Sequence, residues 1–487
     1  MESTGQKSMR GPKDLTTGPI ARTLLLFSLP VLGSNILQSI NGSINAIWVG
    51  QFLGERGLAA TANANLIMFM MFALVFGFGM SSTIVIGHCM GRRDVTGMRR
   101  AVGTGMSLFM LLGVSAAVVG WLAAPRLLHL LGTPEDVFPL ALIYIRVMFL
   151  GLPSGLVTVF LTMSMRGTGD SFTPLLLMLP GMFVDIALNP VLILGLGPAP
   201  RLGIMGAGVA SLAANLVSCI ITLSVIYARD MPIRLRGPEF AYLIPSRDYL
   251  LTIVRKGIPM GLQMVVMSGS ALVMLGLVNR EGTDTVAAYG AANQLWTYIQ
   301  MPAIAIGMAV SSMAAQNIGA GLWDRVDRIA RAGVMTNLGL TGTLVLLTAL
   351  LDSTILRLFL PHAGVAILMA QHIMLLASWS FVLMGLTMVY SSVTRANGAT
   401  LVPLAIMVIA YIPGRLGVVF LLQPLIGADA IWWSFPIGGA LSLAMTAGYY
   451  FQGGWRNAAL MVPVEAEEVE EFVQSEADPA GRMLPNG

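Results

Sequence analysis

The stretch "GMSSTIVIGHCMG" (79–91) recurs later in the chain as "GMAVSSMAAQNIG" (307–319), with Gly and Met at corresponding positions. A second pair has nearly the same offset: "RGTGDSFTP" (166–174) corresponds to "RANGATLVP" (395–403). Self-similarity at a fixed spacing indicates that a chain consists of repeated structural units. The 487 residues therefore predict two copies of one unit, joined head to tail.

The composition is typical of a protein that crosses a membrane many times. Hydrophobic residues make up 56% of the chain and charged residues 11%, whereas soluble domains carry about 25% charged residues. Apolar stretches of about 20 residues, enough to cross roughly 30 Å of hydrocarbon as a helix, recur along the sequence. We expect twelve spans, at approximately 20–42, 57–86, 98–123, 137–163, 173–197, 203–227, 253–279, 285–314, 331–351, 364–392, 400–424 and 428–452.

The repeat and the spans together predict the architecture. Each copy holds six spans, an even number, so both copies enter the membrane from the same side, and such parallel repeats pack about an axis along the membrane normal. We expect an all-α polytopic membrane protein with 12 transmembrane helices in two six-helix lobes around a central cavity. The expected divisions are a cytoplasmic N-terminal segment, an N-lobe, a cytoplasmic linker, a C-lobe and an acidic disordered tail, at 1–19, 20–228, 229–252, 253–456 and 457–487.

The loop charges predict the orientation of the chain. If odd-numbered spans run outward, 21 of the 28 basic residues fall on the inner side, for example in "GRRDVTGMRR" (91–100). Cytoplasmic loops carry the excess of Lys and Arg. We therefore expect a multi-pass protein of the cell membrane with both termini in the cytoplasm.

The sequence lacks the motifs of an ATP-driven pump or of an enzyme. A Walker A loop needs Gly before Lys, whereas the three lysines, at 7, 13 and 256, follow Gln, Pro and Arg. The four histidines form no metal-ligand pair at helical spacing with a catalytic Glu. We expect neither catalysis nor a cofactor, and an ion gradient remains as the energy source.

The stretch "GMFVDIALNP" (181–190) places a carboxylate deep in an apolar span. Asp185 lies roughly 16 Å along its helix, where a carboxylate costs about 2.5–3.5 kcal/mol on insertion scales. Such residues usually face a cavity and carry ions or protons. Asn189 follows one turn later on the same face, and Pro190 removes the helical partner of one carbonyl at this depth. Asp185 is the predicted ion-coupling residue.

Two other spans carry polar stripes at helical spacing, which indicate faces turned toward a bundle interior. Their members are Ser34, Gln38, Asn41 and Asn45 in the first span and Ser211, Asn215 and Ser218 in the sixth. We expect Asn45, Asn41 and Ser211 to join Asp185 and Asn189 in ion coupling, with sodium, if it binds, at Asp185 and Asn189. Two alternatives stay open: the stripes hold helices together by hydrogen bonds, and Asp185 is a structural partner of Arg146.

Aromatic, amide and thioether side chains predict where a substrate binds. The chain has 33 methionines, whose flexible, polarizable side chains adapt to varied apolar shapes, although core or lipid-facing packing is the alternative for any one of them. The span 285–314 adds aromatic and amide residues suited to a flat amphipathic or cationic ligand. The predicted substrate-binding residues are Gln38, Tyr289, Asn293, Trp296 and Phe69, which lies in the methionine-rich stretch "LIMFMMF" (66–72).

Several motifs keep a consistent order over roughly residues 20–450: 28–60, "RGTGDSFTPLLLM" (166–178), "DIALNPVLILGLG" (185–197), "LGIMGAGVASLAANLVS" (202–218), "TVAAYGAANQL" (285–295) and "SSMAAQNIGAG" (311–321). This set resembles the multidrug and toxic compound extrusion (MATE) family of the multidrug/oligosaccharidyl-lipid/polysaccharide exporter superfamily. In relatives the first span usually carries an acid at the position matching Asn45, and the fifth resembles N-x-x-x-D-P where this chain has D-I-A-L-N-P. The resemblance implies a site with one carboxylate, Asp185, where relatives have two.

The expected function is secondary active export of amphipathic or cationic organic compounds by alternating access, in antiport with protons, or with sodium as the alternative ion. A second hypothesis is a flippase or exporter of a lipid-linked or other amphiphilic precursor, which predicts a strongly cationic cavity. Arg146 and Arg415 are the deep basic residues that such a cavity could use. The expected partners are small organic substrates and the lipid bilayer, without nucleic acid, and we expect a monomer.

Overall fold

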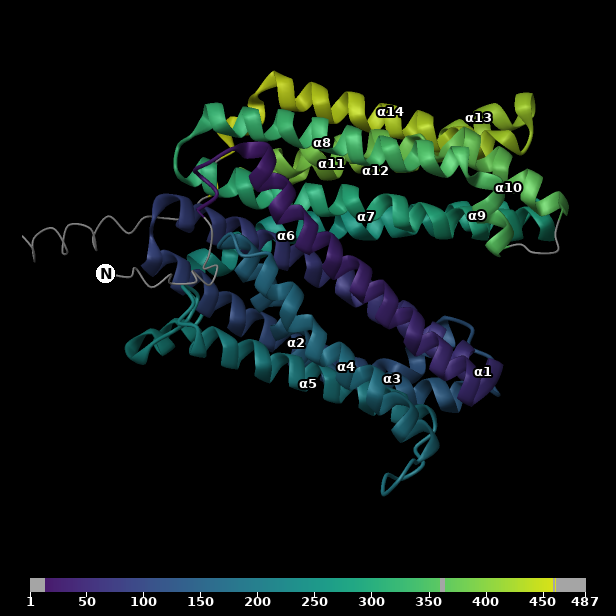
Figure 1. The fold of residues 1–487 in the computed structure, drawn as a ribbon, viewed down its shortest axis with the longest axis horizontal. Coiled ribbons are helices and arrows are strands. Elements are labelled where there is room, and N and C mark those ends of the chain that lie inside the picture. Colours follow the sequence, from purple (N-terminus) through teal and green to yellow (C-terminus); the bar gives the residue numbers. More distant parts are fainter. Residues whose placement is uncertain (1–13, 360–363, 459, 461–487) are drawn as a thin grey trace, which may run out of the picture.

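The computed structural model describes residues 14–359, 364–458 and 460, and these residues form helices and no strand. Figure 1 shows two groups of long helices, purple to teal for the first half of the chain and teal to yellow for the second. The long helices of the first group are α1 (Ile20–Arg92), α2 (Val95–Leu130), α3 (Phe138–Gly167), α4 (Phe172–Leu194) and α5 (Ile204–Ala228). Those of the second are α6 (Arg247–Val278), α7 (Thr283–Gly319), α8 (Trp323–Leu350), α9 (Asp352–Phe359), α10 (Gly364–Ala377), α11 (Ser380–Ala396), α12 (Leu401–Ile409), α13 (Arg415–Ile426) and α14 (Asp429–Gln452).

Helix α1 contains two of the expected spans. Its 73 residues would measure about 110 Å if they were straight, but Gly54 interrupts them with φ 67° and ψ −164°, a backbone region open to glycine. Leu15, before the helix, donates its N–H to Gln316 Oε1 at 3.1 Å, and Gly91, near its end, packs on the backbone of the same residue. Both ends of α1 therefore lie together, and the chain reverses at Gly54. The first crossing extends about ten residues beyond the expected end at 42, because its polar residues face the interior of the protein.

The twelve expected crossings are present. Eleven described helical stretches are long and apolar enough to cross a membrane, and α1 supplies two crossings. The tenth crossing is divided between α10 and α11, and the eleventh between α12 and α13 by the π-helical segment η2 (Ala410–Gly414). The expected linker contains η1 (Gly237–Leu243), and α6 begins within it. The expected tail lies outside the described residues from 461 onward, as does the N-terminal segment before residue 14.

Buried apolar residues form three clusters that show how the two groups of helices meet. One cluster, around Phe149, draws only on α1 to α5, and another, around Trp296, only on α6 to α14. The third joins both groups and includes Ile84 of α1 and Ala314 of α7. We call α1 to α5 the N-lobe and α6 to α14 the C-lobe. The lobes share a core at one end, and each has a core of its own elsewhere.

The two copies of the repeated motif meet at this shared core, which we call the lobe junction. Gln316 Nε2 donates to the carbonyl of Gly167 at 2.9 Å, and His88 Nε2 donates to the carbonyl of Ala396 at 2.7 Å. His88 corresponds to Gln316 in the repeat, and Gly167 corresponds to Ala396. Each lobe therefore donates one hydrogen bond to the equivalent helix end of the other lobe.

A short segment before α1 also crosses the lobe junction. Leu15 is fully buried, and its carbonyl accepts a hydrogen bond from Asn317 Nδ2 at 3.1 Å. Arg325 of α8 donates to the carbonyls of Thr17 and Gly18, each at 2.8 Å. The start of the N-lobe is thereby held on two helices of the C-lobe.

Large apolar side chains remain exposed on the outside of both lobes. Leu122 of α2 is 73% exposed and Leu375 of α10 is 72% exposed. Contiguous apolar surface of this kind is unfavourable in water and matches the hydrocarbon of a bilayer. The protein is a multi-pass membrane protein.

Candidate functional site

Asp185 lies in the middle of α4, on the side that faces the N-lobe interior. It is 4% exposed, and Asn189, one turn later, is 1% exposed. Pro180 and Pro190 lie within the same helix. Because proline has no N–H, each leaves the carbonyl four residues earlier without its helical partner. The helical hydrogen bonding of α4 is therefore interrupted on both sides of Asp185.

Four side chains from three helices contact the carboxylate of Asp185. Its Oδ2 accepts hydrogen bonds from Nδ2 of Asn45 at 2.7 Å and Nδ2 of Asn41 at 2.9 Å, both on α1. Its Oδ1 accepts from Ser211 Oγ of α5 at 3.1 Å and from Asn189 Nδ2 at 3.3 Å. All four donors are neutral, so no cation among them compensates the charge of an ionised Asp185.

Asn189 connects the carboxylate to α1. Its Nδ2 also donates to Asn45 Oδ1 at 2.8 Å and to the backbone carbonyl of Asp185 at 3.1 Å. An amide nitrogen has two hydrogens, so three acceptors share them. The Oδ1 atoms of Asn41 and Asn189 are buried without a partner among the described residues. Two side chains of the cluster therefore offer free acceptors.

The structure brings together all five residues that the sequence predicts for ion coupling: Asp185, Asn189, Asn45, Asn41 and Ser211. Arg146 does not join them, because its guanidinium lies over the ring of Trp121, 5.3 Å from the centroid. The ion pairs found in the described part of the chain include neither Asp185 nor Arg146. The structure does not support the alternative that pairs these two residues.

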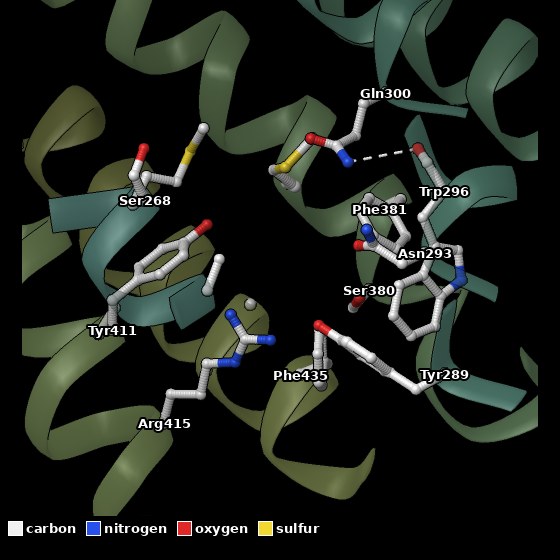
Figure 2. A pocket seen from close by; sticks show the side chains of 16 residues that line it. Ser268, Tyr289, Asn293, Trp296, Gln300, Ser380, Phe381, Tyr411, Arg415 and Phe435 are labelled. Carbon is white, nitrogen blue, oxygen red and sulfur yellow. Dashed lines mark hydrogen bonds between the residues drawn. The ribbon is translucent and has the colours of Figure 1, made fainter. Parts of the chain in front are cut away.

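A cavity of about 210 Å³ lies within the C-lobe (Figure 2). Tyr289, Asn293 and Trp296 of α7 line it, as three of the predicted substrate-binding residues. The rings of Tyr289 and Trp296 are 5.9 Å apart, and Trp296 Nε1 donates to Ser378 Oγ at 2.9 Å. Both aromatic residues are buried, whereas Asn293 is exposed. The rings form a fixed wall, and the amide of Asn293 stands where a ligand can reach it.

The other two predicted substrate-binding residues lie elsewhere. Gln38 and Phe69 both belong to α1, both are exposed, and neither lines the C-lobe cavity. The structure therefore distributes the predicted substrate contacts over the two lobes instead of collecting them in one pocket.

The family model named MatE matches the chain twice, at residues 30–191 and 259–421. The chain belongs to the MatE family. One match lies in each lobe, and both start at a proline, Pro30 and Pro259, that the repeat places in corresponding positions. The internal duplication seen in the sequence is thus a duplication of the MatE unit.

Known proteins similar to this MatE chain include transporters from bacteria. The probable multidrug resistance protein YoeA of Bacillus subtilis is 33% identical over 431 residues, which cover 88% of this chain and 93% of that protein. The FAD transporter of Shewanella oneidensis is 25% identical over 313 residues, 64% of this chain and 68% of that protein. One similar solved structure is described as the outward-facing conformation of a multidrug resistance MATE family transporter of the MOP superfamily. It superposes on this chain with a TM-score of 0.83 at 21% sequence identity. The superposition covers 93% of this chain and 99% of that chain. The fold is that of MATE transporters.

Sequence reasoning about this MatE chain missed part of the C-lobe cavity. Arg415 is recognisable as a deep basic residue, but nothing local places it beside Tyr289 and Trp296, together with Tyr411 and Phe435. A signal that could have drawn attention to it is the repeat: counted from the starts of the two MatE matches Asp185 corresponds to Gly414, and counted from their ends it corresponds to Arg415. Asp185 in the N-lobe and Arg415 in the C-lobe therefore lie at corresponding positions of the repeat, to within one residue.

Proposed function

We propose that this protein is a secondary active exporter of amphipathic organic compounds that acts as a monomer and is driven by the inward movement of protons. Its family, and the name multidrug resistance protein of a relative with 33% identity, support the export of varied small organic compounds. The observation that carries the proposed coupling is a single buried carboxylate, Asp185, held by four neutral donors. Such a group can exchange a proton during each transport cycle.

The donors around Asp185 favour a proton over sodium as the coupling ion. The carboxylate of Asp185 accepts hydrogen bonds from Asn41, Asn45, Asn189 and Ser211. A hard cation binds oxygen atoms. Here the N–H and O–H groups already occupy the carboxylate oxygens, and sodium would have to displace them. A proton needs only one carboxylate oxygen, and the free Oδ1 atoms of Asn41 and Asn189 are candidate acceptors for it.

The positions of the basic residues support an outward-facing conformation, in which the lobes are joined on the cytoplasmic side. Arg92, Arg166 and Arg395 adjoin the lobe junction, where the two lobes share their core. Since basic residues concentrate on the cytoplasmic side, we place the lobe junction and both termini in the cytoplasm. The lobes are then joined on the inner side, and each lobe's own site lies beyond the junction.

The proposal is tested with the purified full-length protein in proteoliposomes loaded with a fluorescent amphipathic dye. An imposed inward proton gradient should accelerate dye efflux, and a sodium gradient of the same size at constant pH should not. Dissipating the proton gradient with an ionophore should return the rate to that of protein-free vesicles. Efflux that ignores both gradients would refute secondary active export, and efflux driven by sodium alone would refute proton coupling.

Ser211→Ala should reduce proton-driven efflux without abolishing it. Ser211 supplies one of four donors to Asp185, and a hydrogen bond of this kind contributes about 1 kcal/mol net, which corresponds to roughly a fivefold change. Efflux rates of Ser211→Ala and of Ser211→Thr, which keeps the hydroxyl, measure the effect in the same vesicles. A rate of Ser211→Ala equal to that of the unmodified protein would remove Ser211 from the coupling site.

A further inference from the structure

The C-lobe cavity contains a positive charge without a carboxylate or hydrogen-bond partner among the described residues. Arg415 is 8% exposed and lies near the middle of the eleventh crossing. In the described part of the chain no carboxylate pairs with it and no hydrogen bond reaches its guanidinium, and its Nε is buried and unpaired. Another arginine of the C-lobe, Arg395, instead donates to Gln263 Oε1 at 2.9 Å and Ser392 Oγ at 3.2 Å. A buried charge without a partner is costly, and deep charges of this kind mark the paths of ions and substrates.

The repeat places Arg415 one residue beyond the position that corresponds to Asp185. Asp185 follows Pro174 by eleven residues, whereas Arg415 follows the corresponding Pro403 by twelve. The π-helical segment η2 lies between Pro403 and Arg415, directly before α13. A π segment contains one residue more than the α-helical turn that it replaces and often occurs at functional sites. Arg415, which follows this segment directly, lines the C-lobe cavity.

Aromatic rings hold the guanidinium without using its N–H groups. The Arg415 Cζ atom lies 3.5 Å from the centroid of the Phe435 ring and 5.9 Å from that of Tyr411. Stacking on a ring face leaves the planar edge free for hydrogen bonds. Figure 2 shows this edge directed into the space between Tyr411 and Tyr289. At Gly438 of α14 a Cβ would lie 3.3 Å from Arg415 Cβ, so the glycine leaves room for the arginine.

We propose that the C-lobe cavity binds a small aromatic monoanion, such as an aryl carboxylate, a class of substrate for the export function proposed above, on which this inference rests. The carboxylate accepts two parallel hydrogen bonds from Arg415, the strongest geometry available to it. The aromatic ring packs against Tyr289 and Trp296. The exposed amide of Asn293 bonds polar substituents on the ring.

Charge and size limit the ligand to this class. One guanidinium balances one negative charge, and it repels the cations that the aromatic residues alone would accept. A cavity of about 210 Å³ is smaller than the roughly 300–1,000 Å³ of pockets for drug-sized ligands, so it accommodates one or two rings. A lipid-linked pyrophosphate exceeds both the charge and the volume, which counts against a flippase for such precursors.

The test compares 2-naphthoate with its neutral analogue 2-naphthamide, titrated calorimetrically into the purified full-length protein in detergent. We expect naphthoate to bind at least about tenfold more tightly than naphthamide. The Arg415→Gln variant should lose this preference, and the Arg415→Lys variant should keep part of it. Arg146→Gln is the matched control, because Arg146 is also deep and stacked on an aromatic ring but lies in the N-lobe. Equal affinity for the two compounds, or a preference that survives Arg415→Gln, would overturn the inference.

Asn293→Asp provides a second test that does not depend on the folding of an Arg415 variant. Asn293 is exposed on the cavity wall, so a carboxylate is tolerated there and should compete with naphthoate for Arg415. An undiminished preference for naphthoate in this variant would also overturn the inference. Binding is measured without a bilayer or a gradient. Preferential binding of naphthoate without gradient-driven efflux would therefore refute the export proposal alone. Gradient-driven efflux without a preference for naphthoate over naphthamide would refute the anion site alone.

Discussion

Replacing Asp185 with Asn is expected to reduce proton-driven dye efflux from proteoliposomes to the rate of protein-free vesicles. Asparagine has nearly the same shape as aspartate, and it can keep part of the hydrogen bonding to Asn41 and Asn45. It cannot gain or lose a proton, so the gradient no longer acts on the site. We expect a loss of about 100-fold or more, the size of effect that positioned proton-transfer groups have in enzymes.

Asp170→Asn is the matched control for this substitution. Asp170 is also buried, at 7% exposure, but it caps the start of α4 by accepting the backbone N–H groups of Phe172 and Thr173. Asparagine caps helices about as well as aspartate, so this variant should fold and couple normally. Proton-driven efflux by Asp185→Asn at the rate of the Asp170→Asn protein would place coupling at another residue.

Gly91→Ala and Gly319→Ala are each expected to force the lobe junction apart. A Cβ on Gly91 would lie 1.9 Å from the carbonyl oxygen of Gln316, and one on Gly319 would lie 2.3 Å from that of His88. Backbone atoms cannot move aside as a flexible side chain can. Overpacking of this kind costs about 1–3 kcal/mol, which shifts the population toward states with separated lobes by fivefold or more.

The native Cys89 reports on this separation. It lies within the repeated motif at the lobe junction and is 3% exposed. In a Cys219→Ser background, its labelling by a soluble thiol reagent should be at least about fivefold faster in Gly91→Ala than in the parent protein. Gly339→Ala in α8 is the control, because a Cβ there meets no atom within 4 Å. Equal labelling and equal thermal stability in all three proteins would show that the close approach of the glycines is not required.

The sequence predicted the lobes and the N-lobe site because both follow from spacing along a helix. The repeated motifs place equivalent helices in two copies, whatever the details of their packing. Asn41 and Asn45 share a face of one helix, and Asp185 and Asn189 share a face of another. A buried carboxylate requires donors, and the structure shows that the face of Asn41 and Asn45 supplies them.

The remaining features depend on packing that no local pattern contains. The expected break between the first two spans, 43–56, contains the reversal at Gly54, but the spacing of apolar residues did not show that the first helix continues as far as this glycine. The π segment η2 and the residue after it supply Tyr411 and Arg415 to the C-lobe cavity, and a π segment has no composition by which the sequence could reveal it. The donors at the lobe junction, His88 and Gln316, differ in residue type, so their common role appears only when the acceptors Ala396 and Gly167 are seen opposite them.

The paired hydrogen bonds at the lobe junction also bear on the proposed transport cycle. One bond runs from the N-lobe to the C-lobe and the other runs back, so a rotation of the lobes about the axis between them stretches both equally. Opening on this side requires both bonds to break, and each contributes about 1 kcal/mol to its cost.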